Sequence, residues 1–132
     1  MVTDEELARM AAEAMGKAYA PYSNFHVGAA VATEDGHVFT GANVENASYG
    51  LTVCAERVAV FKAVSQGHVR IARVAVAASG VQEVLPCGAC RQVLSEFGPG
   101  MTVITVSDGR MTASYSLSEL LPRSFGPRNL QK

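Results

Sequence analysis

The chain has 132 residues, of which 48% are hydrophobic, and a net charge of −1 from 11 basic and 12 acidic residues. This length is typical of one domain that can bury a core, and the composition excludes a disordered protein. The sequence has no run of lysine and arginine, which weighs against a nucleic-acid polymer as substrate or partner and favours a small neutral molecule.

The first ten residues, MVTDEELARM, are acidic and amphipathic, so we expect neither a signal peptide nor a transit peptide. No apolar stretch approaches the length that crosses a bilayer, which predicts no membrane partner. We therefore expect a cytoplasmic protein, in which cysteines stay reduced and serve as metal ligands or catalysts rather than forming disulfides.

Helix and strand patterns alternate along the chain. Thr3 and Glu6 form a capping-box pattern that starts a helix, whose apolar face continues at helical spacing to Ala18, before Pro21. Two strand-like stretches then flank Asp35-Gly36, a strong hairpin signal. The remaining expected elements are a helix at 53–66, a buried strand at 71–79, a helix at 87–97, a buried strand at 101–107, a short strand at 113–116 and a short helix at 117–121.

A helix between two buried strands predicts a crossover connection, with helices covering both faces of a sheet. We therefore expect an α/β protein, a three-layer α-β-α fold with a mixed, mostly parallel central sheet. The sequence has no internal repeat or linker, so residues 1–132 are expected to form a single domain.

The three cysteines are the first candidate functional residues. Cys87 and Cys90 are three residues apart, so on a helix they share a face, and Cys54 begins a different helix. Both helix N-termini would direct their positive ends at the thiols and favour thiolates. Three sulfurs suit Zn²⁺, and a set of three leaves one position open for water, as in catalytic zinc sites.

Other interpretations of the cysteines stay open on spacing alone. The cysteines could be small buried hydrophobic residues. Cys87 and Cys90 could instead form a redox dithiol, or all three could belong to a structural zinc site with a fourth ligand. The histidines of the chain, at positions 26, 37 and 68, have no ligand spacing, and each is expected on the surface or in a loop.

Glu56 and Arg57 follow the first cysteine in the stretch CAER. Glu56 cannot share a helix face with Cys54, so we expect it beside the metal as a proton acceptor rather than a ligand; the alternative is a solvated first-turn glutamate. Three thiolates on Zn²⁺ leave a formal charge of −1 (2 minus 3). Arg57 could donate to the sulfurs and withdraw some of that charge, or it is a surface arginine.

Three longer stretches extend this pattern: YSNFHVGAAV, GANVENASYGLTVCAERVAV and PCGACRQVLSEF. Together with CAE and PCGAC they resemble the zinc-dependent cytidine deaminase family, in order and in spacing. The resemblance implies a hydrolase that converts cytidine and 2′-deoxycytidine to uridine and 2′-deoxyuridine with release of ammonia, in pyrimidine salvage. It implies one Zn²⁺ per subunit on Cys54, Cys87 and Cys90, with Glu56 as the catalytic proton shuttle and zinc-activated water as the nucleophile.

The same resemblance implies the substrate-binding residues. Phe25 would pack against the pyrimidine, Asn43 and Glu45 would bind the ribose hydroxyls, and the backbone at Ala55 would hold the base edge. Tyr49 would line the site. Without the motif context, local sequence predicts that Phe25 is a core residue and that the segment around Asn43 is a turn at a strand end.

The all-cysteine branch of the family also implies a homotetramer whose active sites are completed by neighbouring subunits. Phe125, in the stretch SFGPRNL, is the matching position for a residue that caps the base in another subunit; locally it reads as an anchor of the tail. A blasticidin-type deaminase is a rival, but the stretch NVENASYG favours an ordinary ribose. Deaminases of tRNA or DNA would require a basic surface.

Overall fold

The computed structural model describes residues 1–80 and 83–130. Its helices and strands are α1 Asp4–Ala14, β1 Val27–Thr33, β2 Val38–Ala42, α2 Ala55–Ser65, β3 Ile71–Ala78, α3 Gly88–Phe97, β4 Thr102–Ser107, β5 Arg110–Ser116 and α4 Leu117–Leu120. This order matches the order expected from the sequence. Three short 3₁₀ turns, which the sequence patterns did not predict, lie at Met15–Lys17, Tyr49–Leu51 and Pro127–Leu130.

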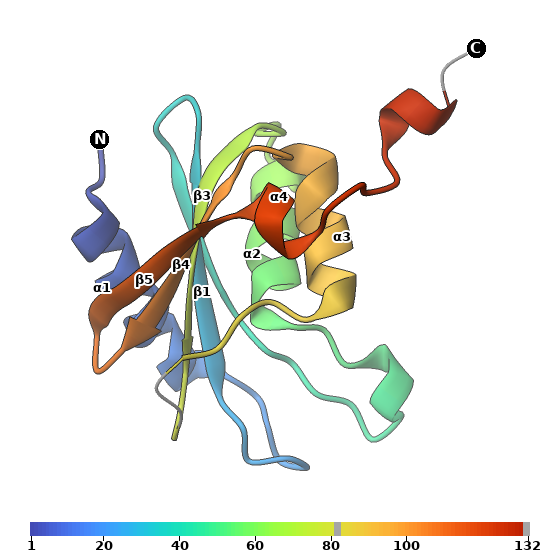
Figure 1. Ribbon diagram of the computed structural model, residues 1–132. Helices are drawn as coiled ribbons and strands as arrows, with labels where there is room; N and C mark the ends of the chain where they lie inside the picture. Colours follow the sequence, from blue (N-terminus) through green and yellow to red (C-terminus); the bar gives the residue numbers. More distant parts are fainter. Residues whose placement is uncertain (81–82, 131–132) are drawn as a thin grey trace.

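The strands form one five-stranded sheet in the order β2-β1-β3-β4-β5. Helix α1 covers one face of the sheet, and α2 and α3 cover the other (Figure 1). The expected three-layer α-β-α arrangement with a mixed sheet is therefore confirmed. Among the described residues, no helix combines the length and the apolar character that spanning a membrane requires.

The expectation of a mostly parallel sheet is wrong. Only the β3–β4 pair is parallel, and the other three neighbouring pairs are antiparallel. Two hairpins account for two antiparallel pairs, one turning at Asp35-Gly36 and one at Asp108-Gly109. The third arises because β1 inserts between β2 and β3, so the crossover through α2 joins strands that are not neighbours. Local sequence patterns do not specify this insertion.

The first helix begins where its sequence predicts. The side chain of Thr3 accepts a hydrogen bond from the backbone N–H of Glu6 at 3.1 Å, and the carboxylate of Glu6 accepts one from the N–H of Thr3 at 2.8 Å. This reciprocal pair satisfies N–H groups that a helix start leaves unpaired. The apolar face of α1, which includes Leu7 and Ala11, is buried against alanines of β1 and β3 and against Ile104 and Val106 of β4.

On the opposite face, α2 and α3 pack over a core that includes Val31, Val76 and Leu94. The helix α2 lies very close to β2, because a Cβ atom on Gly41 would stand 2.6 Å from the backbone nitrogen of Ala59. A glycine at this position allows the close approach. The approach sets the N-terminus of α2 beside the N-terminus of α3, at the end of the sheet where β2 and β3 finish.

Candidate active site

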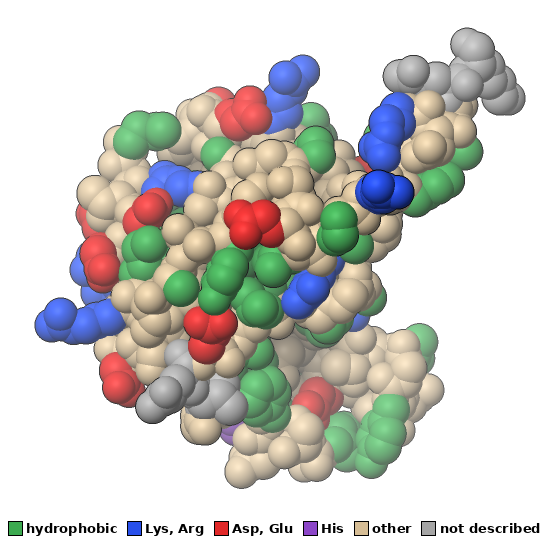
Figure 2. Space-filling model, viewed as in Figure 1, with side chains coloured by type: hydrophobic (Ala, Val, Ile, Leu, Met, Phe, Trp, Pro, Cys, Tyr) green, Lys and Arg blue, Asp and Glu red, His purple; other side chains and the backbone are tan. Residues whose placement is uncertain are grey.

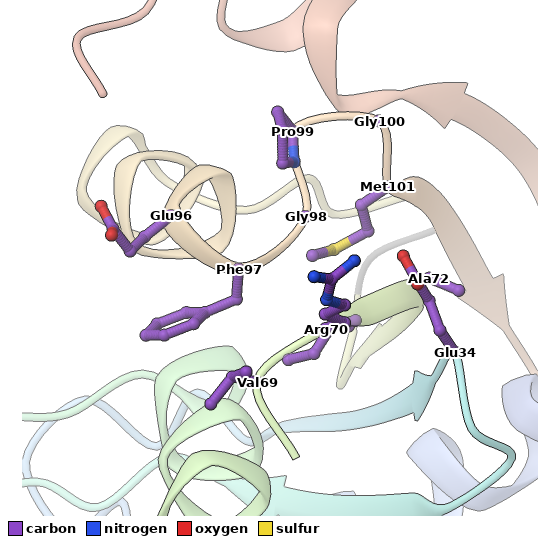
Figure 3. A pocket seen from close by; sticks show the side chains of 11 residues that line it. Glu34, Val69, Arg70, Ala72, Glu96, Phe97, Gly98, Pro99, Gly100 and Met101 are labelled. Atoms are coloured by element: carbon purple, nitrogen blue, oxygen red, sulfur yellow. The ribbon is translucent and has the colours of Figure 1, made fainter. Parts of the chain in front are cut away.

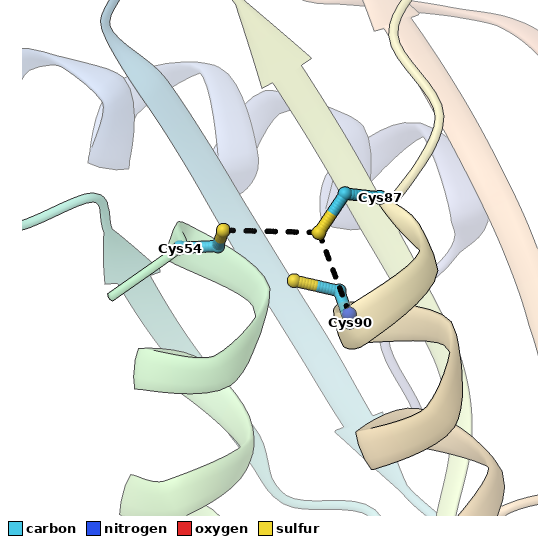
Figure 4. A group of neighbouring side chains, drawn as sticks. All are labelled: Cys54, Cys87 and Cys90. Carbon is cyan, nitrogen blue, oxygen red and sulfur yellow. Dashed lines mark hydrogen bonds between the residues drawn. The ribbon is translucent and has the colours of Figure 1, made fainter. Parts of the chain in front are cut away.

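The three cysteines converge between the N-termini of α2 and α3 (Figure 4). Their sulfur atoms lie within 4.8 Å of one another, and Cys54 Sγ is 4.0 Å from Cys87 Sγ. Cys90 is buried, whereas Cys54 is half-buried and Cys87 is exposed. We call Cys54, Cys87 and Cys90 the thiol cluster. The sequence expectation that two helices bring these residues together is met by the structure.

Local structure explains this placement. Cys54 is the N-cap residue of α2, and Cys87 is the N-cap residue of α3. The sulfur of Cys87 accepts a hydrogen bond from the backbone N–H of Cys90 at 3.5 Å, as an N-cap side chain does. Both helix dipoles therefore present their positive ends to the sulfurs, which favours thiolates over thiols.

The protonation of the thiol cluster is strongly polarised. The pKa of Cys54 is lowered to about 5, because the thiol of Cys90 donates to its sulfur and the guanidinium of Arg57 adds a second donor, which outweighs the effect of burial. The pKa of Cys90 is raised, since its proton is held by Cys54 and its sulfur is buried. One thiolate is thus already formed near neutral pH, ready for a cation.

The cluster fits zinc. Tetrahedral Zn²⁺ with Zn–S bonds of about 2.3 Å separates two sulfurs by about 3.8 Å, and Cys54 and Cys87 are 4.0 Å apart. Thiolates are the ligands that zinc accepts readily, and three of them leave one position for water or substrate. In the part of the chain that the structure describes, no histidine or carboxylate joins the three sulfurs as a fourth member of the group.

Arg57 lies against the cluster. Its guanidinium nitrogen Nη2 is 3.5 Å from Cys54 Sγ, and the two groups form a hydrogen bond. Its Nε atom is buried and has no hydrogen-bond partner among the described residues. A solvated surface arginine would expose this atom, so the side chain is directed inward, where its charge opposes that of the thiolates.

Glu56 is enclosed rather than solvated. Only 4% of its surface is exposed, although it occupies the first turn of α2. Burial raises the pKa of its carboxyl to about 7, and the negative charge of Cys54 adds to that shift. A carboxyl group with a pKa near neutrality can both accept and return a proton at physiological pH, as general acid–base catalysis requires.

A cavity of about 240 Å³ connects the cluster to the proposed substrate-binding residues. Its lining includes Cys54, Cys87, Ala55, Glu56, Phe25, Asn43 and Glu45. It is somewhat smaller than the roughly 300–1,000 Å³ typical of sites for drug-sized ligands, so it suits a small molecule. Six of the nine residues expected to bind zinc or substrate therefore open onto one space with Glu56. The three that do not line it are Cys90, Tyr49 and Phe125.

Asn43 and Glu45 are buried in this cavity wall and already organise the loop before β1. Asn43 Oδ1 accepts from the N–H of Val27 at 2.9 Å, and its Nδ2 donates to the carbonyl of Phe25 at 2.8 Å. Glu45 accepts hydrogen bonds from Ser23, through both its hydroxyl and its backbone N–H, and these lower the pKa of the carboxyl. The alternative that Phe25 is a core residue is wrong, because it is 38% exposed.

Several lining residues were not predicted. Ser23 holds Glu45, and Thr52, Val84 and Leu85 complete the wall. The only sequence signal for Ser23 is its place in the polar loop PYSNF. Val84 and Leu85 carry no such signal, because ordinary apolar residues become cavity lining only through the path of the loop that joins β3 to α3.

Tyr49 and Phe125 lie outside the cavity of their own chain. Tyr49 is 74% exposed on the 3₁₀ turn between β2 and α2, where its ring is 5.9 Å from that of Tyr22. Phe125 is 59% exposed, and its carbonyl accepts a hydrogen bond from Gln92 of α3. Neither ring contacts the thiol cluster within one subunit.

The expectation that the histidines lie in loops holds for His37 and His68, but these two are not scattered. They meet at Asp35, with a ring-centroid separation of 4.1 Å. The residues are 31 positions apart in the sequence, and only the packing of the β1–β2 hairpin against the α2–β3 turn unites them. No spacing rule finds such a pair.

The sequence is similar to a known protein family along most of its length. A model described as the zinc-binding region of cytidine and deoxycytidylate deaminases matches residues 1–106. A cytidine deaminase of Halalkalibacterium halodurans is 48% identical over 120 residues, which cover 90% of this chain and 91% of the relative. A cytidine deaminase of Mycobacterium tuberculosis is 43% identical over 92% of this chain and 89% of its own length.

Solved structures agree with these relatives. A crystal structure of cytidine deaminase from Burkholderia pseudomallei has a TM-score of 0.88 and 48% identity, covering 94% of this chain and all of that chain. A structure of cytidine deaminase from Mycobacterium tuberculosis has a TM-score of 0.83 and 42% identity, covering 96% of this chain and 99% of that one. Fold, thiol cluster and buried carboxylate thus define the class of zinc-binding deaminases. Within that class, the chain belongs to the cytidine deaminase family.

Proposed function

We propose that this chain catalyses the zinc-dependent hydrolytic deamination of cytidine and 2′-deoxycytidine to uridine and 2′-deoxyuridine, with release of ammonia. The observation that carries the proposal is that the buried carboxyl of Glu56 lines one small cavity together with Cys54 and Cys87, two members of a cluster of three thiols. The family named in the comparisons supports the choice of substrate.

In this proposal, Cys54, Cys87 and Cys90 hold one Zn²⁺ per subunit. Held by these residues, the ion would supply Lewis-acid chemistry, lowering the pKa of water and stabilising negative charge near C4 of the base. Arg57 offsets part of the thiolate charge through its contact with Cys54, which keeps the centre electrophilic.

Glu56 moves the protons. It accepts a proton from the attacking water and delivers it to ring nitrogen N3, which makes C4 more electrophilic. It then takes a second proton from the hydroxyl now bonded to C4 and passes it to the amine, so that C4=O forms, the C4–N bond breaks and ammonia leaves. One carboxyl serves as base and acid, and the pKa of about 7 that burial imposes on Glu56 suits this exchange.

The cavity wall binds the nucleoside. Phe25, partly exposed and facing the cavity, packs on the pyrimidine ring, and the backbone at Ala55 meets the edge of the base. Asn43 and Glu45 bind the ribose hydroxyls. The hydrogen bonds that Ser23 and the loop before β1 make to these two residues hold them ready for the diol.

Completion of the site by neighbouring subunits is also part of the proposal. Large hydrophobic side chains remain exposed at Tyr49, Leu51, Phe61 and Phe125, a pattern typical of association surfaces. In a homotetramer, Tyr49 and Phe125 would close the active sites of adjacent subunits. We place the enzyme in cytoplasmic pyrimidine salvage, because reduced thiols are needed to bind the metal.

A polymer substrate is disfavoured. On the face seen in Figure 2, acidic and basic side chains of the described residues are interspersed. Binding to a nucleic-acid backbone requires basic residues gathered on one face, since affinity depends on neutralising phosphates. A single nucleoside carries no phosphate and needs no such surface.

The test is a parallel assay of purified protein whose zinc content is quantified. Ultraviolet absorbance and ammonia release are followed with cytidine, 2′-deoxycytidine, free cytosine and blasticidin S. Turnover of both nucleosides but not of cytosine supports the proposal and a working ribose site at Asn43 and Glu45. Turnover of blasticidin S alone would mean that the substrate is this antibiotic rather than cytidine. No turnover at full zinc content would mean that the zinc site is structural.

A further inference from the structure

A second group of potential ligands lies at the opposite end of the sheet from the thiol cluster. Asp35, His37 and His68 each place a ligand atom within 4.8 Å of the others. The Nδ1 atom of His68 is 2.9 Å from Asp35 Oδ2, and the Nδ1 atom of His37 is 3.5 Å from Asp35 Oδ1. We call Asp35, His37 and His68 the hairpin cluster.

We propose that the hairpin cluster binds a second divalent transition-metal ion, Zn²⁺ or Ni²⁺, independently of the thiol cluster. Two imidazole nitrogens and one carboxylate oxygen are a donor set that suits these ions, whereas Ca²⁺ and Mg²⁺ prefer oxygen ligands alone. Both imidazoles already direct Nδ1 toward the same carboxylate. A cation between them would replace the present hydrogen bonds with three coordinate bonds and retain water at its open positions.

The backbone holds all three ligands in place before any ion arrives. In the hairpin, the N–H of Thr33 donates to the carbonyl of His37 at 2.8 Å. The N–H of Glu34 donates to the carbonyl of Arg70 at 3.0 Å and ties the hairpin to the start of β3. The N–H of His68 donates to the carbonyl of Ala63 at 3.0 Å. Ligands that are ordered in advance lose less conformational entropy on binding.

A buried hydroxyl supports the carboxylate from behind. Thr33 is only 2% exposed; its hydroxyl donates to Asp35 Oδ1 and accepts from the N–H of His37 at 2.9 Å. Such outer contacts orient the first ligands in metal sites. The ring of His68 is also fixed by Phe39, whose centroid is 5.4 Å away.

Solvent reaches the cluster. The side chains of Asp35 and His37 are 59% and 57% exposed. A hollow of about 360 Å³, lined by residues that include Asp35, His68, Glu34 and Arg70, opens beside them. It adjoins a wider groove of about 680 Å³, whose lining residues Glu34, Val69 and Arg70 are shown in Figure 3. Glu34 and Arg70 carry opposite charges, so together they leave the approach of a cation nearly neutral.

The position of the cluster sets the consequence of binding. β1 pairs with β3 from Val27 opposite Ala78, near the thiol cluster, to Thr33 opposite Ile71, beside the hairpin cluster. An ion here would clamp the β1–β2 hairpin to the α2–β3 turn without contacting the active site. Because such an ion binds only the folded chain, it stabilises the fold by mass action and leaves the chemistry unchanged.

The experiment uses protein already loaded with one zinc per chain at the thiol cluster, checked by protection of the three thiols. Further Zn²⁺ is added while NMR follows the imidazole signals of all three histidines. We expect the signals of His37 and His68 to shift together and to saturate at one added equivalent, with His26 unchanged. Absence of a shift at millimolar Zn²⁺, or equal shifts at His26, would overturn the proposal. The readout is independent of deamination.

Variants give a matched control. Asp35→Asn removes one ligand of the hairpin cluster at an Asp-Gly turn. Asp108→Asn makes the same change at the other Asp-Gly turn, and Asp108 is not part of the hairpin cluster. Loss of a ligand should weaken binding of the added zinc by more than ~10-fold, since loss of an outer contact alone gives ~10–100-fold. Asp108→Asn should bind as the unmodified chain does. His68→Asn repeats the test at a second ligand. If neither variant changed the affinity for the added zinc, the hairpin cluster would be only an ion pair and the proposal would be wrong.

Discussion

The two ends of the sheet each gather three potential metal ligands, but from different kinds of local structure. The thiol cluster lies at two helix N-termini, beside a buried glutamate. The hairpin cluster lies on turns, and two of its three side chains are more than half exposed. At the first end, hydrogen bonds from Cys90 and Arg57 lower the pKa of Cys54, and burial raises the pKa of Glu56. Proximity of the ligands is enough for binding an ion, whereas catalysis also needs an enclosed, polarised environment.

The largest effect should follow from removing a ligand of the thiol cluster. Cys87→Ser keeps an N-cap acceptor for α3 but replaces a soft thiolate with a poor zinc ligand. We expect the zinc content after dialysis to fall from one to far below one per chain, and deamination to be lost with it. Metal analysis and the nucleoside assay measure both, with circular dichroism as the check on folding. Full zinc content in this variant would contradict the proposed ligand set.

The second prediction separates metal binding from proton transfer at the same end. Glu56→Gln preserves the shape of the side chain but cannot accept a proton, so kcat should fall by at least ~10²–10⁴-fold while zinc is retained. Glu96→Gln, on the exposed face of α3, is the matched control and should keep full activity. Near-normal turnover of a zinc-loaded Glu56→Gln sample would remove the proton shuttle from the mechanism.

The third prediction concerns the charge balance at the thiol cluster. Arg57→Ala removes the donor to Cys54, so the thiolate charge is left uncompensated. Zinc affinity or kcat/KM should fall by ~10–100-fold, the range for loss of an outer contact in a metal site. Arg9→Ala, an exposed arginine of α1, is the control. If Arg57→Ala matched that control in both measurements, Arg57 would be a scaffold residue.

The smallest effect is expected at the hairpin end, and it depends on pH. Hydrogen bonds from Thr33, and then from His68 and His37, lower the pKa of Asp35 to about 2 from an ordinary value of 3.8. A lowered carboxyl pKa contributes stability above pH 3.8, and this contribution is lost as the pH falls through about 2. Without added metal, Asp35→Asn should therefore lower Tm slightly at neutral pH, and the difference should vanish near pH 2. A difference in Tm that grew as the pH fell from 3.8 to about 2 would contradict the assignment.

Much of the fold could be predicted because its signals are local. The capping box at Thr3, the turn at Asp35-Gly36 and the apolar runs of β3 and β4 each involve residues within a few positions of one another. The direction of strand pairing could not be predicted in this way. The placement of β1 between β2 and β3 depends on how whole elements pack, and the expected mostly parallel sheet was wrong for this reason.

The candidate site divides along the same line. The sequence alone identified residues that are chemically suited to such a site, since CAER and PCGAC supply three candidate thiol ligands, a carboxylate and an arginine, whose roles the family resemblance implied. The burial of Glu56, the hydrogen bonds from Ser23 to Glu45 and the contact between His37 and His68 arise only when the chain is folded. Burial and contacts between distant segments result from the packing of whole elements, so the residues next to a position in the sequence do not determine them.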